Sequence, residues 1–125
     1  MTKNITKAKK SEPLVIDATG MSLGRVASMA AKALRGKDST AFQRHTLPGV
    51  VVKITNAKAM RVLERKLINK KYARYSGYPG GLRFESLQDL VAAKGYREAI
   101  REAIHGMIPN NKLRPEIMKC LTITE

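Results

Sequence analysis

The sequence is poor in the side chains from which metal and redox sites are built. One cysteine and two histidines occur in 125 residues. A single cysteine excludes an internal disulfide, and Cys120 lies in an apolar run, so we predict a small buried hydrophobic side chain there. His45 and His105 are far apart and lack the spacing of a metal-ligand pair. We therefore predict no metal site, no cofactor and no activated cysteine nucleophile.

Long apolar runs are also missing. No stretch approaches the roughly 20 residues that span a bilayer, and residues 1–10 lack the apolar segment of a signal peptide. We therefore expect a cytoplasmic protein with no membrane partner. The hydrophobic fraction of 43% is high enough to build a core, so global disorder is not expected. A chain of this length suits one domain.

Acidic residues are scarce. Ten Asp and Glu oppose 24 Lys and Arg, which gives a net charge of +14. Such a surface repels itself unless a polyanion neutralises it. Charge alone leaves RNA, DNA and an anionic membrane surface as candidate partners.

The positive charge is concentrated in two segments. Residues 61–83 hold seven basic residues and one acidic residue, whereas residues 85–102 hold three basic and four acidic ones. The N-terminal tail has four lysines and no acid before Glu12. A charge pattern that serves only solubility mixes both signs. We therefore predict that a basic arm at 61–83 and the tail contact the polyanion through its phosphates.

Three tyrosines are interleaved with the charges of this arm. Tyr72, Tyr75 and Tyr78 could stack on unpaired bases or hydrogen-bond to phosphate or ribose. The alternative is that these rings cover a sheet edge or the neighbouring glycine-rich loop. The glycines of that loop would let the backbone approach a ligand closely.

Apolar periodicity predicts an α/β fold. Residues 14–18 read as a buried strand, residues 23–34 as an amphipathic helix capped by Ser22 and ended by Gly36, and residues 50–55 as a second strand. A strand–helix–strand order at this spacing indicates a right-handed crossover in a parallel sheet.

The remaining elements are expected to be mostly helical. Residues 56–82 are predicted to hold a helical turn, a strand near 59–63 and an extended basic arm, with a loop at 76–81. Further on, we expect helices at 87–94, opened by a Ser86–Asp89 capping pair, at 96–107 and at 116–120. A strand at 121–124 is expected to close the chain.

The turn after the first strand raises an alternative function. A strand, a glycine turn and a helix start could cradle a phosphate, as in a small nucleotide-dependent enzyme. Gly20 and Gly24 fit neither the GxGxxG nor the GxxxxGK[ST] pattern, however. We therefore expect Gly24 to permit close packing on the sheet and Asp17 to serve the turn. A regulatory RNA- or DNA-binding module is the other alternative, although no helix-turn-helix element is visible.

Three motifs resemble a known family. The first is VIDATGMSLGRVA from Val15, which continues to LRGK at residues 34–37. The second is YSGYPGGL from Tyr75, and the third is HGMIPNNKL from His105, which continues to Leu121. In order and spacing they are similar to the thirteenth protein of the large ribosomal subunit, bacterial type. The resemblance implies a three-layer α/β/α single domain around a small parallel sheet at 13–125, after a basic tail at 1–12.

The resemblance also implies a function. Members of this family are structural constituents that bind and brace large-subunit ribosomal RNA during assembly, beside neighbouring ribosomal proteins. It implies no catalysis and no small-molecule substrate. Motif positions and charge together give one set of expected RNA contacts: Lys9, Lys10, Arg25, Arg35, Lys37, Arg44, Lys66, Lys70, Lys71, Arg74, Tyr75, Gly77, Tyr78, Gly80, Gly81, Arg83, Lys112 and Arg114.

The sequence departs from the family pattern at a few places. Tyr75 stands where relatives commonly have His, and Arg114 stands where they favour glycine. Residues 62–66 replace a stretch that usually includes a Thr-Gly turn. The sequence also ends at Glu125, earlier than typical bacterial relatives, so we expect the RNA footprint to shift toward the arm and the tail.

Overall fold

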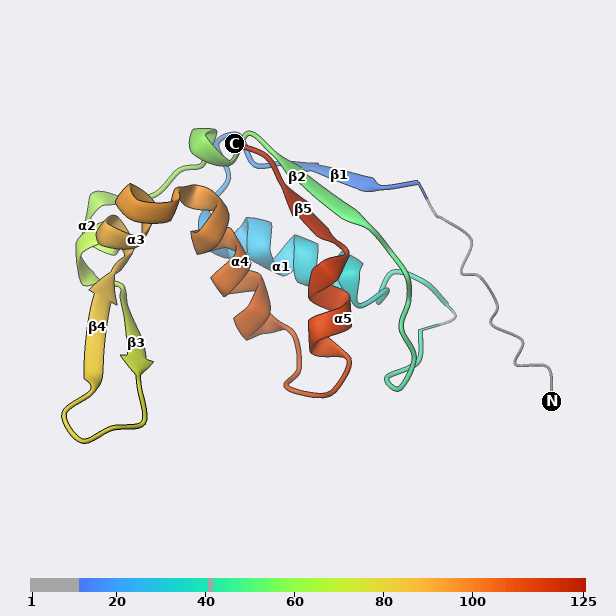
Figure 1. The fold of residues 1–125 in the computed structure, drawn as a ribbon. Coiled ribbons are helices and arrows are strands. Elements are labelled where there is room, and N and C mark those ends of the chain that lie inside the picture. Colours follow the sequence, from blue (N-terminus) through green and yellow to red (C-terminus); the bar gives the residue numbers. More distant parts are fainter. Residues whose placement is uncertain (1–11, 41) are drawn as a thin grey trace.

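A small parallel sheet forms one side of the molecule, and helices lie beneath it (Figure 1). The computed structural model describes residues 12–40 and 42–125. The sheet has the order β1-β2-β5, and both neighbouring pairs are parallel. Its strands are β1 (Leu14–Asp17), β2 (Val52–Thr55) and β5 (Leu121–Ile123). The predicted α/β class and the parallel sheet are confirmed.

Helix α1 (Leu23–Leu34) connects β1 to β2, as the apolar spacing predicts. Its buried side chains, including Val26, Ala30 and Leu34, face the core. Ser22 is the N-cap residue, but its hydroxyl makes no capping hydrogen bond. Gly36 adopts the predicted left-handed conformation, with φ of 70°. A Cβ at Gly36 would also lie 2.7 Å from Cβ of Pro48, so both backbone and space require glycine there.

Within the described part of the chain, helices cover only one face of the sheet. Val52 and Ile54 point into the core, whereas Lys53 between them is exposed. Val15 and Thr122 of the neighbouring strands are exposed as well. Helices α1, α4 (Tyr96–Met107) and α5 (Arg114–Lys119) all lie on the covered side (Figure 1). Residues 12–40 and 42–125 thus form two layers, and the second helical layer expected from the family resemblance is not found among them.

The segment after β2 differs from the prediction. The strand expected near 59–63 is wrong, because a short 3-10 helix, Ala57–Ala59, follows β2 and is followed by a single bridge between Ser22 and Arg61. Asn56 turns the chain out of the sheet with a left-handed φ of 57°. The apolar run that suggested a strand has Met60 buried but Leu63 62% exposed, so it is not a continuous buried edge.

The expected basic extended arm is present and contains regular structure. Its residues make helix α2 (Glu64–Asn69) and an antiparallel hairpin of β3 (Lys71–Tyr75) and β4 (Leu82–Ser86). The hairpin projects from the body beside α2 and α3 (Leu87–Lys94) (Figure 1). We call residues 61–86 the basic arm from here on. The loop predicted at 76–81 is its tip.

The C-terminal helices follow the prediction closely. Helices α3 and α4 have the predicted bounds, and the Ser86 hydroxyl accepts a hydrogen bond from the Asp89 amide as a cap should. Gly95 joins the two helices with φ of 81°. Helix α5 begins at Arg114, two residues before the predicted start. A second, small core of Leu87, Leu90 and Ala99 joins α3 to α4.

Candidate nucleic-acid interface

The hairpin of the basic arm has two unlike faces, because directly opposed residues of an antiparallel pair share a face. On the first face, Tyr72 opposes Glu85 and Arg74 opposes Arg83. Tyr72 packs against the small core beneath α3. The Arg74 guanidinium donates a hydrogen bond to the Glu102 carboxylate of α4 at 3.0 Å. This face therefore fastens the hairpin to the body.

The electrostatics of this face agree with its packing. Burial raises the pKa of the Tyr72 hydroxyl, and the negative Glu102 raises it further. The hydrogen bond to Glu102 is the main cause that raises the pKa of Arg74. Tyr72 thus packs within the protein, but against the small core rather than a sheet edge or the glycine-rich loop. Arg74, an expected RNA contact, already has a partner within the chain.

The second face of the hairpin is apolar and open. Ala73 opposes Phe84, and Tyr75 opposes Leu82. Phe84 is 64% exposed, Tyr75 67% and Leu82 53%, and Tyr78 at the tip is 75% exposed. Adjacent exposed rings of this kind mark an interaction surface rather than a core. The sequence prediction missed Phe84 and Leu82; alternation around the 76–81 loop was the signal for them.

The backbone conformation of the tip explains its glycines. Gly77 and Gly80 have φ of 85° and 73°. The Gly81 amide donates to the Tyr78 carbonyl at 3.0 Å, and the order Pro79-Gly80 between them is typical of a type II turn. The turn itself therefore needs these residues. Contact of Gly77, Gly80 and Gly81 with RNA stays a prediction.

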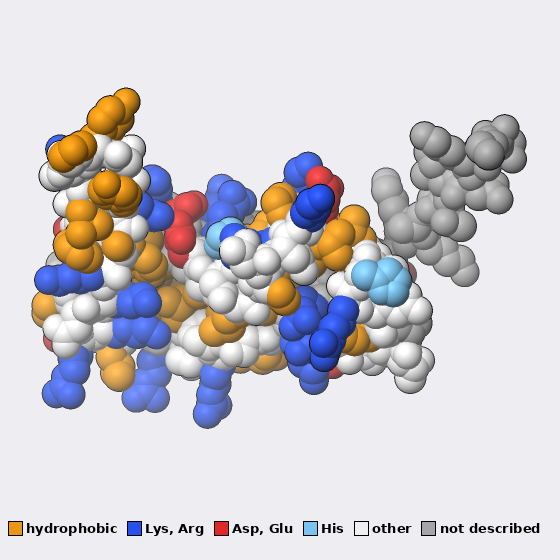
Figure 2. Space-filling model, turned by 90° about the horizontal axis from the view of Figure 1, so that it is seen from below, with side chains coloured by type: hydrophobic (Ala, Val, Ile, Leu, Met, Phe, Trp, Pro, Cys, Tyr) orange, Lys and Arg blue, Asp and Glu red, His pale blue; other side chains and the backbone are white. Residues whose placement is uncertain are grey.

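The charges of the basic arm are mostly unneutralised. Of the seven basic residues predicted at 61–83, Arg74 alone has an ion pair within the described part of the chain. Arg83 stands directly opposite Arg74, whose own charge Glu102 already neutralises. The exposed basic residues that remain are Arg61, Arg65, Lys66, Lys70, Lys71 and Arg83. Figure 2 shows Lys and Arg side chains spread over the side that faces away from the sheet.

A second group of expected contacts meets beyond the end of α1. Arg35 is half-buried, with its guanidinium carbon 5.8 Å from the centre of the Phe42 ring. Arg35 and Arg44 line one shallow depression together with Pro109 and Asn111 of the third motif. The structure thus brings the first and third motifs together, far apart in sequence. Lys37, two residues after Arg35, and Lys112, directly after Asn111, are both exposed. Lys9 and Lys10 lie outside the described residues.

Two further expected contacts, Arg114 and Arg25, lie near the starts of helices. The Asn111 side chain accepts hydrogen bonds from the amides of Leu113 and Arg114 at 3.0 and 3.2 Å, which fixes the start of α5. Arg114 is half-buried at this helix start. Arg25, in the first turn of α1, lines a hollow of about 420 Å³ with Arg61.

Asp17 serves the turn after β1, as predicted. Its carboxylate accepts from the Thr19 amide, the Thr19 hydroxyl and the Asn56 side chain, at 2.7–3.1 Å. The hydrogen bond from the Thr19 amide is the largest cause that lowers the pKa of Asp17. The predicted role of Gly24 is wrong, however, because a Cβ there would meet nothing within 4 Å in the described structure. Gly24 therefore does not mediate close packing on the sheet.

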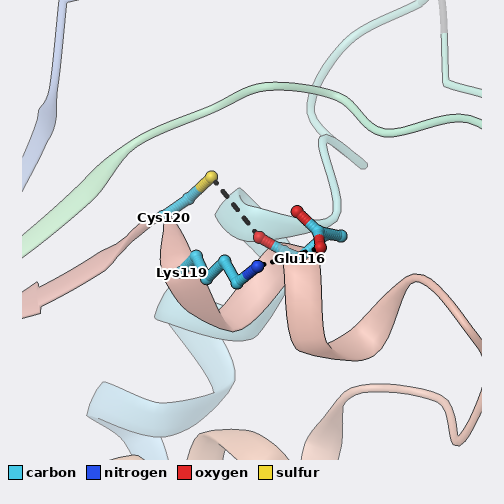
Figure 3. A network of polar contacts seen from close by, with 3 residues as sticks. All are labelled: Glu116, Lys119 and Cys120. Atoms are coloured by element: carbon cyan, nitrogen blue, oxygen red, sulfur yellow. Dashed lines mark hydrogen bonds and ion pairs between the residues drawn. The ribbon is translucent and has the colours of Figure 1, made fainter.

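Cys120 is only partly buried, at the end of α5, where it packs against the main core. Its Sγ lies 3.7 Å from the Glu116 carbonyl oxygen, and Lys119 pairs with the Glu116 carboxylate at 3.0 Å (Figure 3). Among the described residues no group of three His, Cys, Asp or Glu side chains could hold a metal ion. No helix of that part is long and apolar enough to cross a membrane.

Comparison with known proteins identifies the family. The family model for ribosomal protein L13 matches residues 11–125. The chain belongs to this family. It is thus a structural ribosomal protein and not an enzyme, which removes the nucleotide-dependent enzyme as an alternative.

Three relatives illustrate the similarity, each named large ribosomal subunit protein uL13. The protein from Moorella thermoacetica is 44% identical over 109 residues, which cover 87% of this chain and 75% of the relative. A Dehalococcoides mccartyi protein is 46% identical over 111 residues, 89% of this chain and 77% of the relative. The Leptothrix cholodnii protein is 40% identical over 124 residues, 96% of this chain and 87% of the relative.

Proposed function

We propose that this ribosomal protein binds and braces the RNA of the large subunit, and that it contributes in this way to subunit assembly and translation in the cytoplasm. Family membership supports the ribosomal setting, and the relatives' names support the large subunit. The observation that carries RNA binding is the unneutralised charge of the basic arm beside the open apolar face of its hairpin.

The arm suits folded RNA for physical reasons. Its free Lys and Arg side chains neutralise phosphates and release counterions. Tyr75, Tyr78 and Phe84 offer ring faces on which unpaired bases stack, and stacking is how proteins read RNA loops and bulges. RNA shape, rather than a sequence code, then sets the specificity.

The remaining expected contacts complete the proposed footprint. Arg35, Lys37, Arg44, Lys112 and Arg114 form a second contact region around the third motif, and the basic tail at 1–12 adds Lys9 and Lys10 to the domain at 13–125. Neighbouring large-subunit proteins adjoin the RNA-bound chain. Arg25 contacts RNA from the start of α1.

Two measurements test this function. The chain should remain with large subunits during sedimentation through a high-salt wash. It should bind a large-subunit RNA fragment more tightly than an unrelated structured RNA of equal length. Equal affinity for both RNAs would contradict a specific partner and favour a general nucleic-acid-binding module.

A further inference from the structure

Two hollows lie next to each other along α1 on its exposed side. The first, of about 280 Å³, lies between α1, α2 and α4 and is lined by Gly24, Lys66, Lys70 and Gly106. The second, of about 320 Å³, is lined by Ser28, Lys32, Arg35 and Lys37. Met107 of α4 borders both hollows, and the Ser28 hydroxyl lies 3.6 Å from its sulfur. We call the two hollows together the α1 groove.

Two helical glycines face this groove, although neither backbone conformation nor packing within the described structure requires glycine there. Gly24 lies in the first turn of α1 and Gly106 in the last turn of α4. Neither has a positive φ, and a Cβ at either position would meet no other atom within 4 Å in the described structure. Glycine lowers helix stability relative to alanine. The fold therefore does not explain these two glycines, but a partner that needs room in the groove does.

The groove is cationic. Lys66, Arg35 and Lys37 have no ion pair within residues 12–40 and 42–125. Lys70 lies over the Tyr72 ring, with its Nζ 5.5 Å from the ring centre. Among the described residues, Glu102 is the one carboxylate that lines the first hollow, and Arg74 pairs with it at 3.0 Å. At the second hollow Lys32 pairs with Asp38, which leaves Arg35 and Lys37 in excess.

The length of the groove fits a short strand of nucleic acid. From Gly24 to Arg35 a helix rises about 16 Å, at 1.5 Å per residue. A stacked strand advances about 3.4 Å per nucleotide, so this distance corresponds to about five nucleotides. The positive lining selects the anionic backbone of such a strand, because phosphate contacts depend on charge and close approach.

We propose that the α1 groove holds one strand of ribosomal RNA by its ribose–phosphate backbone. The strand passes over Gly24 and Gly106, where a side chain would block it. Lys66 and Lys70 neutralise phosphates at one end of the groove, and Arg35 and Lys37 do so at the other. This site rests on the proposed RNA binding, and it is separate from the open face of the hairpin.

Filling the floor of the groove tests the proposal with the full chain and a large-subunit RNA fragment. The double variant Gly24→Ala/Gly106→Ala should melt at the same or a higher temperature and should lose affinity about tenfold or more. Gly24→Leu/Gly106→Leu should lose more. The control Ala92→Leu/Ala93→Leu, on the exposed side of α3, should bind like the wild type. Wild-type affinity for both glycine variants would overturn the groove, and the basic arm would still account for RNA binding.

A second readout locates the strand. Ser28→Cys in a Cys120→Ser background places the single cysteine in the groove, where a tethered iron chelate generates hydroxyl radicals. We expect cleavage of one continuous RNA segment of about five nucleotides. Absence of RNA cleavage there would overturn the proposal and would leave an acidic protein segment as the occupant. If the wild-type chain itself shows no preference for this RNA, the proposed function fails together with the groove.

Discussion

The body and the basic arm of this molecule are built on opposite principles. In the body, apolar side chains such as Ile54 and Ile100 are fully buried under the sheet. In the arm, rings such as Tyr75 and Phe84 are exposed, and most charges have no ion pair among the described residues. The side chains of the body pack against one another, whereas those of the arm are exposed and can contact a partner. Residues in the body should therefore affect stability, and residues in the arm should affect binding.

The largest effect should come from the core. Leu90 is fully buried between α3 and α4, so Leu90→Ala should lower the free energy of unfolding by about 2–5 kcal/mol. Phe84→Ala removes a larger but 64% exposed side chain and should change it by less than about 0.5 kcal/mol. Urea denaturation of both variants measures this difference. Equal destabilisation would mean that the hairpin face is packed in the free protein.

The tyrosines of β3 should separate binding from stability. Tyr75→Ala should weaken RNA binding by about 1–3 kcal/mol, the range for one stacked base, and leave the melting temperature unchanged. Tyr72→Ala should instead lower the melting temperature, because this ring packs on the small core. Affinity and thermal melting are measured on both variants. A loss of stability for Tyr75→Ala with full affinity would reverse the assignment of the two faces.

The ion pair that fastens the hairpin should contribute less. Arg74 and Glu102 are partly exposed, so Arg74→Ala and Glu102→Ala should show a coupling of about 0.2–1 kcal/mol in a double-mutant cycle. The more exposed pair of Lys119 and Glu116, three residues apart on α5, is the control, with a coupling of about 0.2–0.5 kcal/mol. A coupling near zero for Arg74 and Glu102 would mean that Tyr72 alone fastens the hairpin.

The smallest effect should be the pH dependence at Asp17. Its folded-state pKa lies below the ordinary value of 3.8, so the ionised carboxylate stabilises the fold above that value. Asp17→Asn should therefore melt slightly below the wild type at pH 7. The difference should shrink as the pH falls below 3.8 toward the lowered pKa. A difference that stays constant across this range would show that the charge of Asp17 is not involved.

The same contrast explains what the sequence predicted well. Helices α1 and α4 were predicted with their observed bounds, because one apolar face of each is buried in the body. Helix α3 was predicted with its observed bounds from the Ser86–Asp89 capping pair that opens it. The parallel sheet was predicted from the two short apolar runs that precede and follow α1 in the sequence. Burial by the chain itself produces the periodic pattern that such predictions read.

The arm could not be predicted in the same way. The order Lys-Tyr-Ala-Arg-Tyr of β3 places one tyrosine on each face, and of these two only Tyr72 is covered by the described residues. No one-sided apolar pattern results, so the sequence predicted an extended arm but not the pairing of its strands into a hairpin. Gly24 was assigned to internal packing because a sequence does not show whether its surroundings are empty. The charges of the arm, in contrast, could be predicted directly, because the charge of a Lys or Arg residue follows from its type and does not depend on what it packs against.

The salt dependence of RNA binding by two matched double variants tests the central claim most directly. Lys71→Ala/Arg83→Ala removes two charges from the arm, and Lys94→Ala/Arg101→Ala removes two exposed charges from α3 and α4. The arm variant should reduce the slope of log K against log salt by about 1.4–1.8, which corresponds to a loss of affinity of about 10–30-fold at 0.15 M salt. The helix variant should keep the wild-type slope. Equal slopes for the two variants would contradict the assignment of the arm as the RNA-binding region.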